Sequence, residues 1–261
     1  MKILQSRNNP LLKHLIKLSG SSRERRLSST AILDGEHLIE AYCAACIAPL
    51  DLIVASEAGM QKAGIRKLME SAPAHSRVLI EDRLLSQISQ VVTTSGILAL
   101  MRTPAVPELP ARIDDGIFLE GIQDPGNLGS ILRSALGAGL QTVFLSGGSV
   151  FAWSPKVIRA GMGAHFHLAI HENVDLRQIR ERASGVIVAT QCDAAQSIYE
   201  ANLRVPAIWM FGNEGAGLSQ AAQDTAGLNV RIPMAGQTES LNIAAAAAIC
   251  LFEQQRQRLS P

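Results

Sequence analysis

Aromatic side chains are scarce in this chain of 261 residues, where phenylalanine, tryptophan and tyrosine together make up 4% of the sequence. Stacking of nucleobases on an aromatic platform is therefore not the expected mode of binding. The four cysteines do not make a disulfide framework in a chain of this size. No apolar signal segment follows Lys2, and the longest apolar run, Ile243 to Phe252, is too short to span a bilayer. These absences predict a soluble cytoplasmic protein of a reducing compartment, with no membrane partner.

The residues that are present indicate a globular protein with one basic end. Apolar residues make up 47% and charged residues 18% of the chain, which is enough material for one large domain or two ordinary ones. The formal net charge of the whole chain is only +1. Residues 1–30, however, contain one acidic side chain and seven basic ones: Lys2, Arg7, Lys13, Lys17, Arg23, Arg25 and Arg26. Such a cluster is typical of an anionic partner, with RNA as the leading candidate. A solvated amphipathic helix explains it about equally well at this point.

A proline-rich segment separates two regions of the chain. Three prolines recur at every third position between residues 102 and 110, a pattern that excludes a helix interior and a central strand. The segment therefore favours an extended linker. We predict a first domain over residues 1–101, a linker over 102–115 and a second domain over 116–261. Within the first domain, which reads as a compact α/β unit, short strands are expected at 31–33, 52–55, 77–80 and 96–100.

Beyond the linker, apolar strand-like runs alternate regularly with helical segments. A last helix is expected over about residues 241–258. The strand-like runs lie at 117–122, 142–146, 186–190, 206–211 and 228–232, with a weaker candidate at 166–170. This alternation predicts an α/β fold in which a mostly parallel sheet is covered by helices.

Two glycine-rich segments in the last third of the chain begin where strand-like runs end. The first is Phe211–Ser219, with the sequence FGNEGAGLS, and the second is Ile232–Asn242, with the sequence IPMAGQTESLN. Glycine lets a backbone approach a ligand closely or adopt a positive φ. Open α/β sheets bind ligands at the carboxyl ends of their strands, so the two segments predict one pocket built from loops.

A third segment, Leu119–Arg133, runs from a strand end through a Pro-Gly turn into a helix that starts near Asn127. The free backbone N–H groups of such a helix start suit a phosphate or another anion. Arg133 falls between one and two turns into the helix. Taken alone, the segment fits an ordinary connection with a capping Asn127 and a surface Arg133 better than it fits an anion site.

Taken together and in this order, the three segments resemble the three sequence motifs of the SpoU (TrmH-like) family of RNA ribose 2′-O-methyltransferases, within the SPOUT superfamily. The resemblance covers roughly residues 117–256. The patterns that carry it are Asn127-x-Gly129-x-x-x-Arg133, Gly212-Asn213-Glu214-Gly215-x-Gly217-Leu218-Ser219 and Ile232-Pro233-Met234-x-Gly236-x-x-x-Ser240-Leu241-Asn242. Three motifs in one order at plausible spacing make this a specific match.

The resemblance implies a trefoil-knotted α/β catalytic domain, S-adenosylmethionine as the cofactor, RNA as the substrate, and a homodimer with the active site at or near the interface. It implies a cofactor pocket lined, largely through backbone groups, by Gly212, Ile232, Met234 and Leu241. It also implies a polar catalytic set made of Asn127, Arg133, Glu214, Ser240 and Asn242.

Methyl transfer to a ribose hydroxyl requires alignment of the 2′-oxygen with the methyl group and removal of a proton. The family's usual candidate for activating the hydroxyl is the arginine that Arg133 matches. A guanidinium keeps its proton to a pKa above about 12, so we assign Arg133 to holding the target phosphate and polarising the hydroxyl, with base action as an open proposal. Glu214 is the alternative base if burial raises its pKa, and a structural carboxylate that caps the loop is an equally good interpretation.

The first hundred residues resemble the substrate-binding domain of ribosomal-RNA members of this family, which is similar to a ribosomal-protein fold that binds RNA. The resemblance rests on Ser6-Arg7-Asn8-Asn9-Pro10 ahead of a basic helix and on Leu33-Asp34-Gly35-Glu36. It implies RNA contacts from the side chains of Arg7, Lys13, Arg23, Arg25 and Arg26. It favours ribosomal RNA as the substrate. A tRNA 2′-O-methyltransferase and a non-catalytic RNA-binding protein that keeps the fold stay open as alternatives.

The remaining candidate motifs predict no metal site. Cys43 and Cys46 have redox or half-zinc spacing but no second pair of ligands, so they are expected as buried small apolar residues. His165, His167 and His171 are expected as partly exposed residues at a strand edge. The glycines of the second motif lack the spacing of a dinucleotide-binding loop, which counts against an oxidoreductase.

Overall fold

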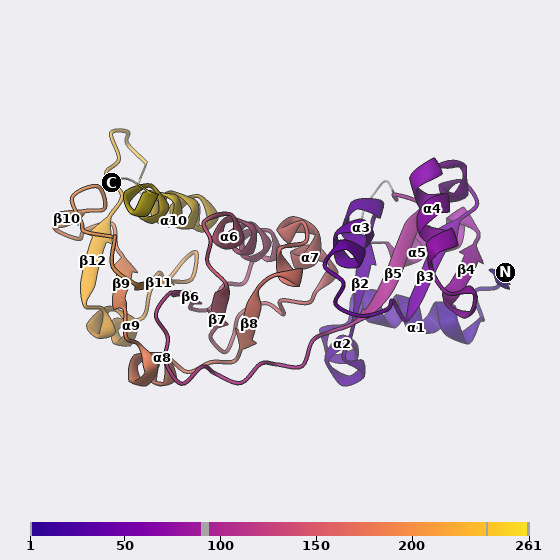
Figure 1. The fold of residues 1–261 in the computed structure, drawn as a ribbon, viewed down its shortest axis with the longest axis horizontal. Helices are drawn as coiled ribbons and strands as arrows, with labels where there is room; N and C mark the ends of the chain where they lie inside the picture. The colour runs from indigo at the N-terminus through magenta and orange to yellow at the C-terminus, as the bar shows by residue number, and fades with distance from the viewer. Residues whose placement is uncertain (1, 90–93, 239, 260–261) are drawn as a thin grey trace. The chain divides into compact units, whose positions relative to one another are not determined.

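The computed structural model of the chain describes residues 2–89, 94–238 and 240–259, and the chain divides into two compact units. The first unit comprises Met1–Ala105 and Trp153–Phe166, and the second comprises Val106–Ala152 and His167–Pro261. Both have the α/β composition that the alternating sequence pattern predicts (Figure 1).

The segment Trp153–Phe166 groups with the first unit, although the sequence boundaries place it in the second domain. Helix α7 (Pro155–Gly161) of this segment packs on strand β2 (Thr30–Asp34). Arg159 of α7 is ion-paired with Asp34 at the end of β2, with 3.2 Å between Nη2 and Oδ2. Sequence spacing carries no signal for a contact between residues 125 positions apart.

The first unit is built on a five-stranded sheet in the order β1-β4-β3-β5-β2. Its first three strands are parallel, and β5 is antiparallel to both β3 and β2. The strands are β1 (Lys2–Leu4), β2 (Thr30–Asp34), β3 (Leu52–Ser56), β4 (Arg77–Ile80) and β5 (Ile97–Arg102). The four predicted strands are confirmed, and β1 is an additional short strand.

Short helices cover this sheet, and their apolar faces supply its core. Asn9 caps the first helix by accepting a hydrogen bond from the Leu11 N–H, and the buried Leu12, Leu15 and Leu18 recur on one face of it. The helices are α1 (Pro10–Gly20), α2 (Ser22–Ser28), α3 (Glu36–Ala44), α4 (Ala63–Ser71) and α5 (Asp82–Ile88), with single 3₁₀ turns at Gly59–Gln61, Ala74–Ser76 and Ala164–Phe166.

The second unit is built on a seven-stranded sheet in the order β10-β12-β9-β11-β6-β7-β8, and every pairing in it is parallel. The central strand is apolar along its whole length, as a strand covered on both faces must be. The strands are β6 (Gly116–Leu119), β7 (Thr142–Leu145), β8 (Ala169–Glu172), β9 (Val186–Thr190), β10 (Gln196–Ser197), β11 (Ala207–Phe211) and β12 (Leu228–Arg231). The predicted mostly parallel sheet is confirmed.

Helices lie on both faces of this sheet (Figure 1). Two long helices pack side by side on one face, and two short ones lie on the other. The long pair is α6 (Pro125–Gly137) and α10 (Ile243–Leu259), and the short pair is α8 (Leu176–Arg182) and α9 (Gln220–Thr225). The side chain of Trp209 on β11 is fully buried, and its Nε1 donates to Gln254 of α10 at 2.8 Å. Across the described parts of both units, the helices are too short or too polar to cross a membrane.

His171 on the edge strand β8 is held against the linker. Its side chain is buried, its ring stacks on Phe144 with 5.1 Å between centroids, and its Nδ1 lies 3.1 Å from the Pro107 carbonyl oxygen. A carbonyl only accepts hydrogen bonds, so Nδ1 carries the proton. The expectation of partly exposed histidines is therefore wrong for His171, because the linker covers it. It is also wrong for His165, which is buried in the first unit.

We expect the protein to lose stability as the pH falls below about 6.5. Burial lowers the pKa of His171, and the hydrogen bond to Pro107 opposes this only in part. The unfolded chain therefore takes up the proton first, so the stabilisation is complete above the unfolded-state pKa of about 6.5 and is lost as the pH falls toward the lower folded-state pKa. Urea unfolding at several pH values should show a shallower pH dependence for His171→Phe. Equal slopes for the variant and the wild type would contradict this.

Candidate functional site

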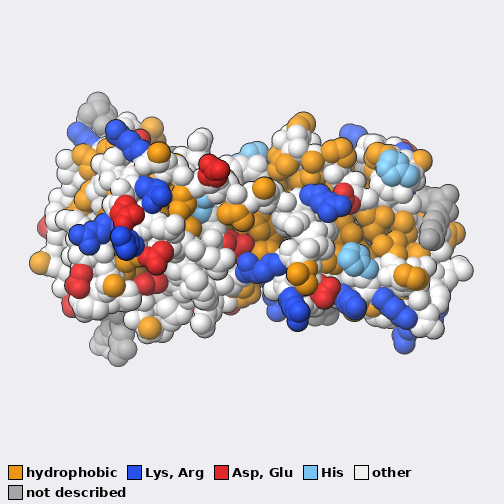
Figure 2. All heavy atoms as spheres, turned by 90° about the horizontal axis from the view of Figure 1, so that it is seen from below, with side chains coloured by type: hydrophobic (Ala, Val, Ile, Leu, Met, Phe, Trp, Pro, Cys, Tyr) orange, Lys and Arg blue, Asp and Glu red, His pale blue; other side chains and the backbone are white. Residues whose placement is uncertain are grey.

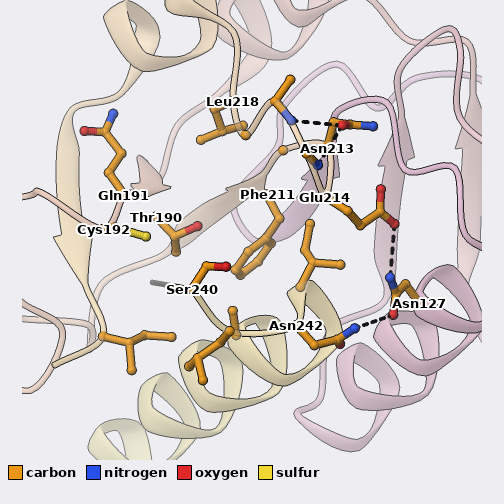
Figure 3. A pocket seen from close by; sticks show the side chains of 18 of the residues that line it. Asn127, Thr190, Gln191, Cys192, Phe211, Asn213, Glu214, Leu218, Ser240 and Asn242 are labelled. Atoms are coloured by element: carbon orange, nitrogen blue, oxygen red, sulfur yellow. Dashed lines mark hydrogen bonds between the residues drawn. The ribbon is translucent and has the colours of Figure 1, made fainter. Parts of the chain in front are cut away.

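A cavity of about 590 Å³ lies at the carboxyl ends of β9, β11 and β12, where open α/β sheets bind ligands (Figure 3). Its volume falls in the range of small-molecule sites. The two glycine-rich segments and the start of α10 together form most of its wall. The lining consists of Asn127, residues 190–192, residues 211–218, Val230, Ile232, Met234, residues 240–243 and Ala246.

All four residues predicted to contact a cofactor line this cavity: Gly212, Ile232, Met234 and Leu241. Gly212 is required by the close approach of two backbone segments. A Cβ atom at this position would lie closer than 3.0 Å to the carbonyl group of Gly217 and to the backbone nitrogen of Leu218. The backbone crossing leaves no room for a side chain and lets main-chain groups form the cavity wall.

Three polar side chains from distant parts of the sequence form a hydrogen-bonded chain at one side of the cavity (Figure 3). Asn242 Nδ2 donates to Asn127 Oδ1 at 2.9 Å, and Asn127 Nδ2 donates to Glu214 Oε1 at 3.1 Å. Asn242 also caps α10, because its Oδ1 accepts from the Ala244 N–H at 2.9 Å. Each amide therefore has a fixed orientation, with its nitrogen directed along the chain toward the carboxylate.

Glu214 is exposed, so the burial that its interpretation as a base assumed is not present. Its Oε1 also accepts a hydrogen bond from the Asp124 N–H at 3.4 Å, just ahead of helix α6. The carboxylate is thus oriented by two N–H donors. Ser240 lines the cavity as well, and its carbonyl oxygen accepts from the Thr238 hydroxyl at 3.2 Å.

Arg133 is not among the residues that line the cavity. It lies on α6, six residues after Asn127, and its side chain is exposed. Six residues correspond to roughly 9 Å along a helix axis. The structure therefore brings together four members of the predicted catalytic set and leaves the fifth on the outer surface of α6.

The sequence motifs do not include the part of the cavity wall that follows β9. Thr190, Gln191 and Cys192 lie on the side of the cavity away from the Asn127–Glu214 chain (Figure 3). The Thr190 hydroxyl donates to the Met210 carbonyl at 3.4 Å and so joins β9 to β11. One signal could have found these residues, because β9 is a buried strand that ends at the same sheet edge as β11 and β12.

Four of the five residues predicted to bind RNA are exposed on the first unit, namely Arg7, Lys13, Arg23 and Arg26. Figure 2 shows Lys and Arg side chains gathered along one border of this unit. Arg25 is different, because its residue is only 4% exposed. Its guanidinium donates to the carbonyl oxygens of Leu18 and Ser19 at the end of α1 and to the Ser22 hydroxyl at 2.8 Å. We therefore correct the prediction for Arg25, whose side chain bonds the end of α1 inside the unit.

Arg25→Ala should lower the free energy of unfolding by about 2–3 kcal/mol, because it leaves buried carbonyl groups without a donor. Arg23 lies on the same helix with an exposed side chain, and Arg23→Ala should change stability by less than about 0.5 kcal/mol. Chemical denaturation of the two variants tests this. Equal stability of Arg25→Ala and the wild type would contradict the structural role.

Cys43 and Cys46 are exposed at the end of α3, so the expectation that they are buried is wrong. The helix ends there, and Cys46 adopts a positive φ of 51° in the turn that follows. Within the described residues, no group of three or more His, Cys, Asp or Glu side chains is placed to hold a metal ion.

Residues 116–252, which span most of the second unit together with the segment Trp153–Phe166, match the family described as the SpoU rRNA Methylase family. Across both units, the chain is 31% identical to the 23S rRNA (guanosine(2553)-2′-O)-methyltransferase RlmP of Bacillus subtilis (strain 168), covering 97% of this chain and 98% of that protein.

Solved structures are similar over the same length. The crystal structure of an RNA 2′-O ribose methyltransferase has a TM-score of 0.86 and 32% identity, and the match covers 99% of this chain and 100% of that one. The SpoU methyltransferase AviRb of Streptomyces viridochromogenes, in complex with the cofactor AdoMet, has a TM-score of 0.85 and 26% identity, covering 97% of this chain and 100% of that one.

Proposed function

The chain belongs to the SpoU rRNA methylase family, and we propose from this premise that it transfers a methyl group from S-adenosylmethionine to a ribose 2′-hydroxyl of ribosomal RNA. The observation that carries the proposal is the cavity that unites the two glycine-rich segments with the Asn242–Asn127–Glu214 chain. A full-length relative named as a 23S rRNA 2′-O-methyltransferase and a full-length structural relative in complex with AdoMet support it.

The residues of the cavity fit S-adenosylmethionine. Because Gly212 has no Cβ, main-chain atoms form the cavity wall where its backbone lies close to that of Gly217. Ile232, Met234 and Leu241 add apolar surface suited to a nucleoside. When bound, the cofactor supplies an electrophilic methyl group on a sulfonium. The protein's own groups then have to hold the ribose, align its 2′-oxygen and deal with the hydroxyl proton.

Glu214 is the group best oriented to accept a hydrogen bond from the ribose hydroxyl. Among the described residues, the N–H groups of Asp124 and Asn127 both donate to Oε1 of this carboxylate, so Oε2 is the oxygen that we assign to the ribose hydroxyl. Asn127 and Asn242 keep the carboxylate in this orientation, and Ser240 adds a hydroxyl to the same cavity. The hydroxyl proton becomes strongly acidic as the oxygen bonds to the methyl group, so the exposed Glu214 carboxylate accepts it in this scheme without the burial that the sequence interpretation assumed. The guanidinium of Arg133 stays charged and holds a phosphate of the RNA.

Arg133→Ala should slow methyl transfer by about tenfold to 100-fold and weaken RNA binding, because a charged phosphate contact is lost. Its side chain is exposed and outside the cavity wall, so the stability and the cofactor affinity should stay at wild-type values. Single-turnover transfer of a labelled methyl group measures the rate. A wild-type rate in a folded variant that binds the cofactor would refute the role of Arg133.

The proposal extends to a trefoil knot in the second unit. Strand β12 pairs with β9 on the side away from β11, yet the segment after β12 must reach α10, which packs beside α6. This segment shares a single cavity with the segments that follow β9 and β11. The segment between β12 and α10 therefore passes back beside the segments that follow β9 and β11. A trefoil knot in this part of the chain requires such a return path.

The proposal also includes a homodimer and RNA binding by the first unit. The outer face of α10 carries Phe252, which is 46% exposed and lies next to Gly137 of α6. A second copy that covers this face would bury the aromatic ring and bring partner groups near Arg133 on α6.

Lys13 and Arg23 are exposed on the first unit and supply charge for the RNA backbone. A cytoplasmic location stays a prediction from the sequence.

Calorimetric titration with S-adenosylmethionine, followed by transfer of a labelled methyl group to purified ribosomal RNA and tRNA, tests this function. We expect cofactor binding and label in ribosomal RNA at a ribose 2′-oxygen. Label confined to tRNA would replace the substrate class, and RNA binding without methyl transfer would favour the non-catalytic alternative. Failure to bind the cofactor would refute the proposal.

A further inference from the structure

The side chain of Asn213 holds the shape of the loop over residues 213–217, which forms one wall of the cavity (Figure 3). Its Oδ1 accepts hydrogen bonds from the N–H groups of Gly215 at 2.9 Å and Ala216 at 3.1 Å. The backbone of Asn213 also pairs with that of Gly217 through two hydrogen bonds of 3.0 and 2.8 Å. Asn213 therefore fixes the conformation of the loop twice, through its backbone pairing with Gly217 and through the hydrogen bonds of its side chain.

The same side chain ties the loop to the neighbouring strand ends. Asn213 Nδ2 donates to the carbonyl oxygen of Gly121 at 2.8 Å, just beyond β6. Gly121 has a positive φ of 65°, and its own N–H donates to the Ser146 hydroxyl at 2.9 Å, just beyond β7. Since β6 lies between β11 and β7 in the sheet, the Asn213 amide joins the ends of β11 and β6, and the Gly121 N–H extends the connection to the end of β7.

This placement bears directly on Glu214, the next residue in the loop. The residues that follow it, 215–217, have no side chain longer than a methyl group. The backbone of Glu214 is therefore positioned by the hydrogen bonds of Asn213, because no large neighbouring side chain in the loop can pack to hold it. A shift of the loop by about 1 Å would move the carboxylate away from the Asn127 amide, and misplacement on this scale costs about 100-fold in rate.

We propose that Asn213 is a positioning residue for methyl transfer: its amide sets the cofactor wall of the cavity and the place of the Glu214 carboxylate together. The inference rests on the proposed function, because it assigns the work of this side chain within that reaction. It needs no contact between Asn213 and the reacting atoms.

Three variants separate the two halves of the amide. Asn213→Ala removes every hydrogen bond of the side chain. Asn213→Asp keeps the acceptor for Gly215 and Ala216 but loses the donor to Gly121. Ser146→Ala leaves Asn213 intact and removes the hydroxyl that accepts from the Gly121 N–H. Asn202→Ala is the matched control, because Asn202 is exposed, lies away from the cavity and makes the same kind of local bond to the Arg204 N–H at 3.2 Å.

The affinity for S-adenosylmethionine, kcat at saturating cofactor and RNA, the affinity for RNA and the melting temperature are measured for each variant. For Asn213→Ala we expect about tenfold weaker cofactor binding and a kcat lower by at least about tenfold, with RNA affinity unchanged and the protein folded. Asn213→Asp should fall between Asn213→Ala and Ser146→Ala, and Asn202→Ala should match the wild type.

Wild-type cofactor affinity and kcat in Asn213→Ala would overturn the proposal, as would equal losses in Asn202→Ala. If Asn213→Ala does not fold, Asn213→Asp and Ser146→Ala decide, and wild-type values in both would overturn it. Should the wild type bind the cofactor but methylate no RNA, the proposed function fails, whereas the ratio of cofactor affinities still tests the role of Asn213.

Discussion

Gly212→Ala should weaken cofactor binding about 100-fold in an otherwise folded protein. The new Cβ would lie closer than 3.0 Å to backbone atoms of Gly217 and Leu218. Backbone atoms in a hydrogen-bonded loop cannot rotate aside as the end of a long side chain can, so the loop must open. Closing the loop again to form the cofactor wall would then cost about 3 kcal/mol of overpacking. This cost corresponds to about 100-fold weaker binding of S-adenosylmethionine in calorimetric titration.

Gly236→Ala is the matched control for this prediction. Gly236 belongs to the second glycine-rich segment, but a Cβ at this position would meet no atom of the described residues within 4 Å beyond its chain neighbours. The substitution should therefore leave cofactor affinity unchanged. If Gly212→Ala binds the cofactor as tightly as Gly236→Ala does, the close approach of the two backbone segments does not form the binding wall.

Asn127→Ala should lower kcat by about 100-fold while the affinity for S-adenosylmethionine stays near the wild-type value. The change removes the side chain that joins Asn242 to Glu214, so the carboxylate loses a donor at 3.1 Å and the Asn242 amide loses its acceptor. The hydrogen bond that caps α6 is kept, because it uses the backbone N–H of residue 127 and the Asp124 side chain. Single-turnover methyl transfer measures the effect.

Two further variants define what Asn127 contributes. Asn127→Asp keeps an acceptor for Asn242 but places a second carboxylate beside Glu214, so it should not restore the rate. Asn229→Ala, at an exposed position on β12, should behave as the wild type. A wild-type rate for either substitution at residue 127 would show that the amide chain is not part of the reaction.

Regular features of the sequence predict most of the second unit. Apolar runs that alternate with helical segments predict a parallel sheet, because the central strands of such a sheet are buried on both faces and parallel strands are joined by crossovers that are usually helices. The short edge strands β1 and β10 leave no such pattern, since three and two residues are too few to show a period. Nor does the pattern show that residues 153–166 pack with the first unit.

The members of the site are recognisable from the sequence, but their arrangement is not. Asn127 lies 87 residues before Glu214 and 115 before Asn242, so only the fold shows that the three form a hydrogen-bonded chain. Arg25 and Arg23 are alike in charge and two residues apart, yet only Arg25 points back to the end of α1 and is buried. Burial of that kind depends on the corner between two helices, which local spacing does not encode.

Comparison of ribose 2′-O-methylation maps from cells with and without the gene tests the proposed reaction most directly. We expect one ribose methyl group to be missing from ribosomal RNA when the gene is absent, with tRNA unchanged. The wild-type gene should restore it, and the Asn127→Ala gene should not. Identical maps of ribosomal RNA with and without the gene would contradict methyl transfer to ribosomal RNA by this protein.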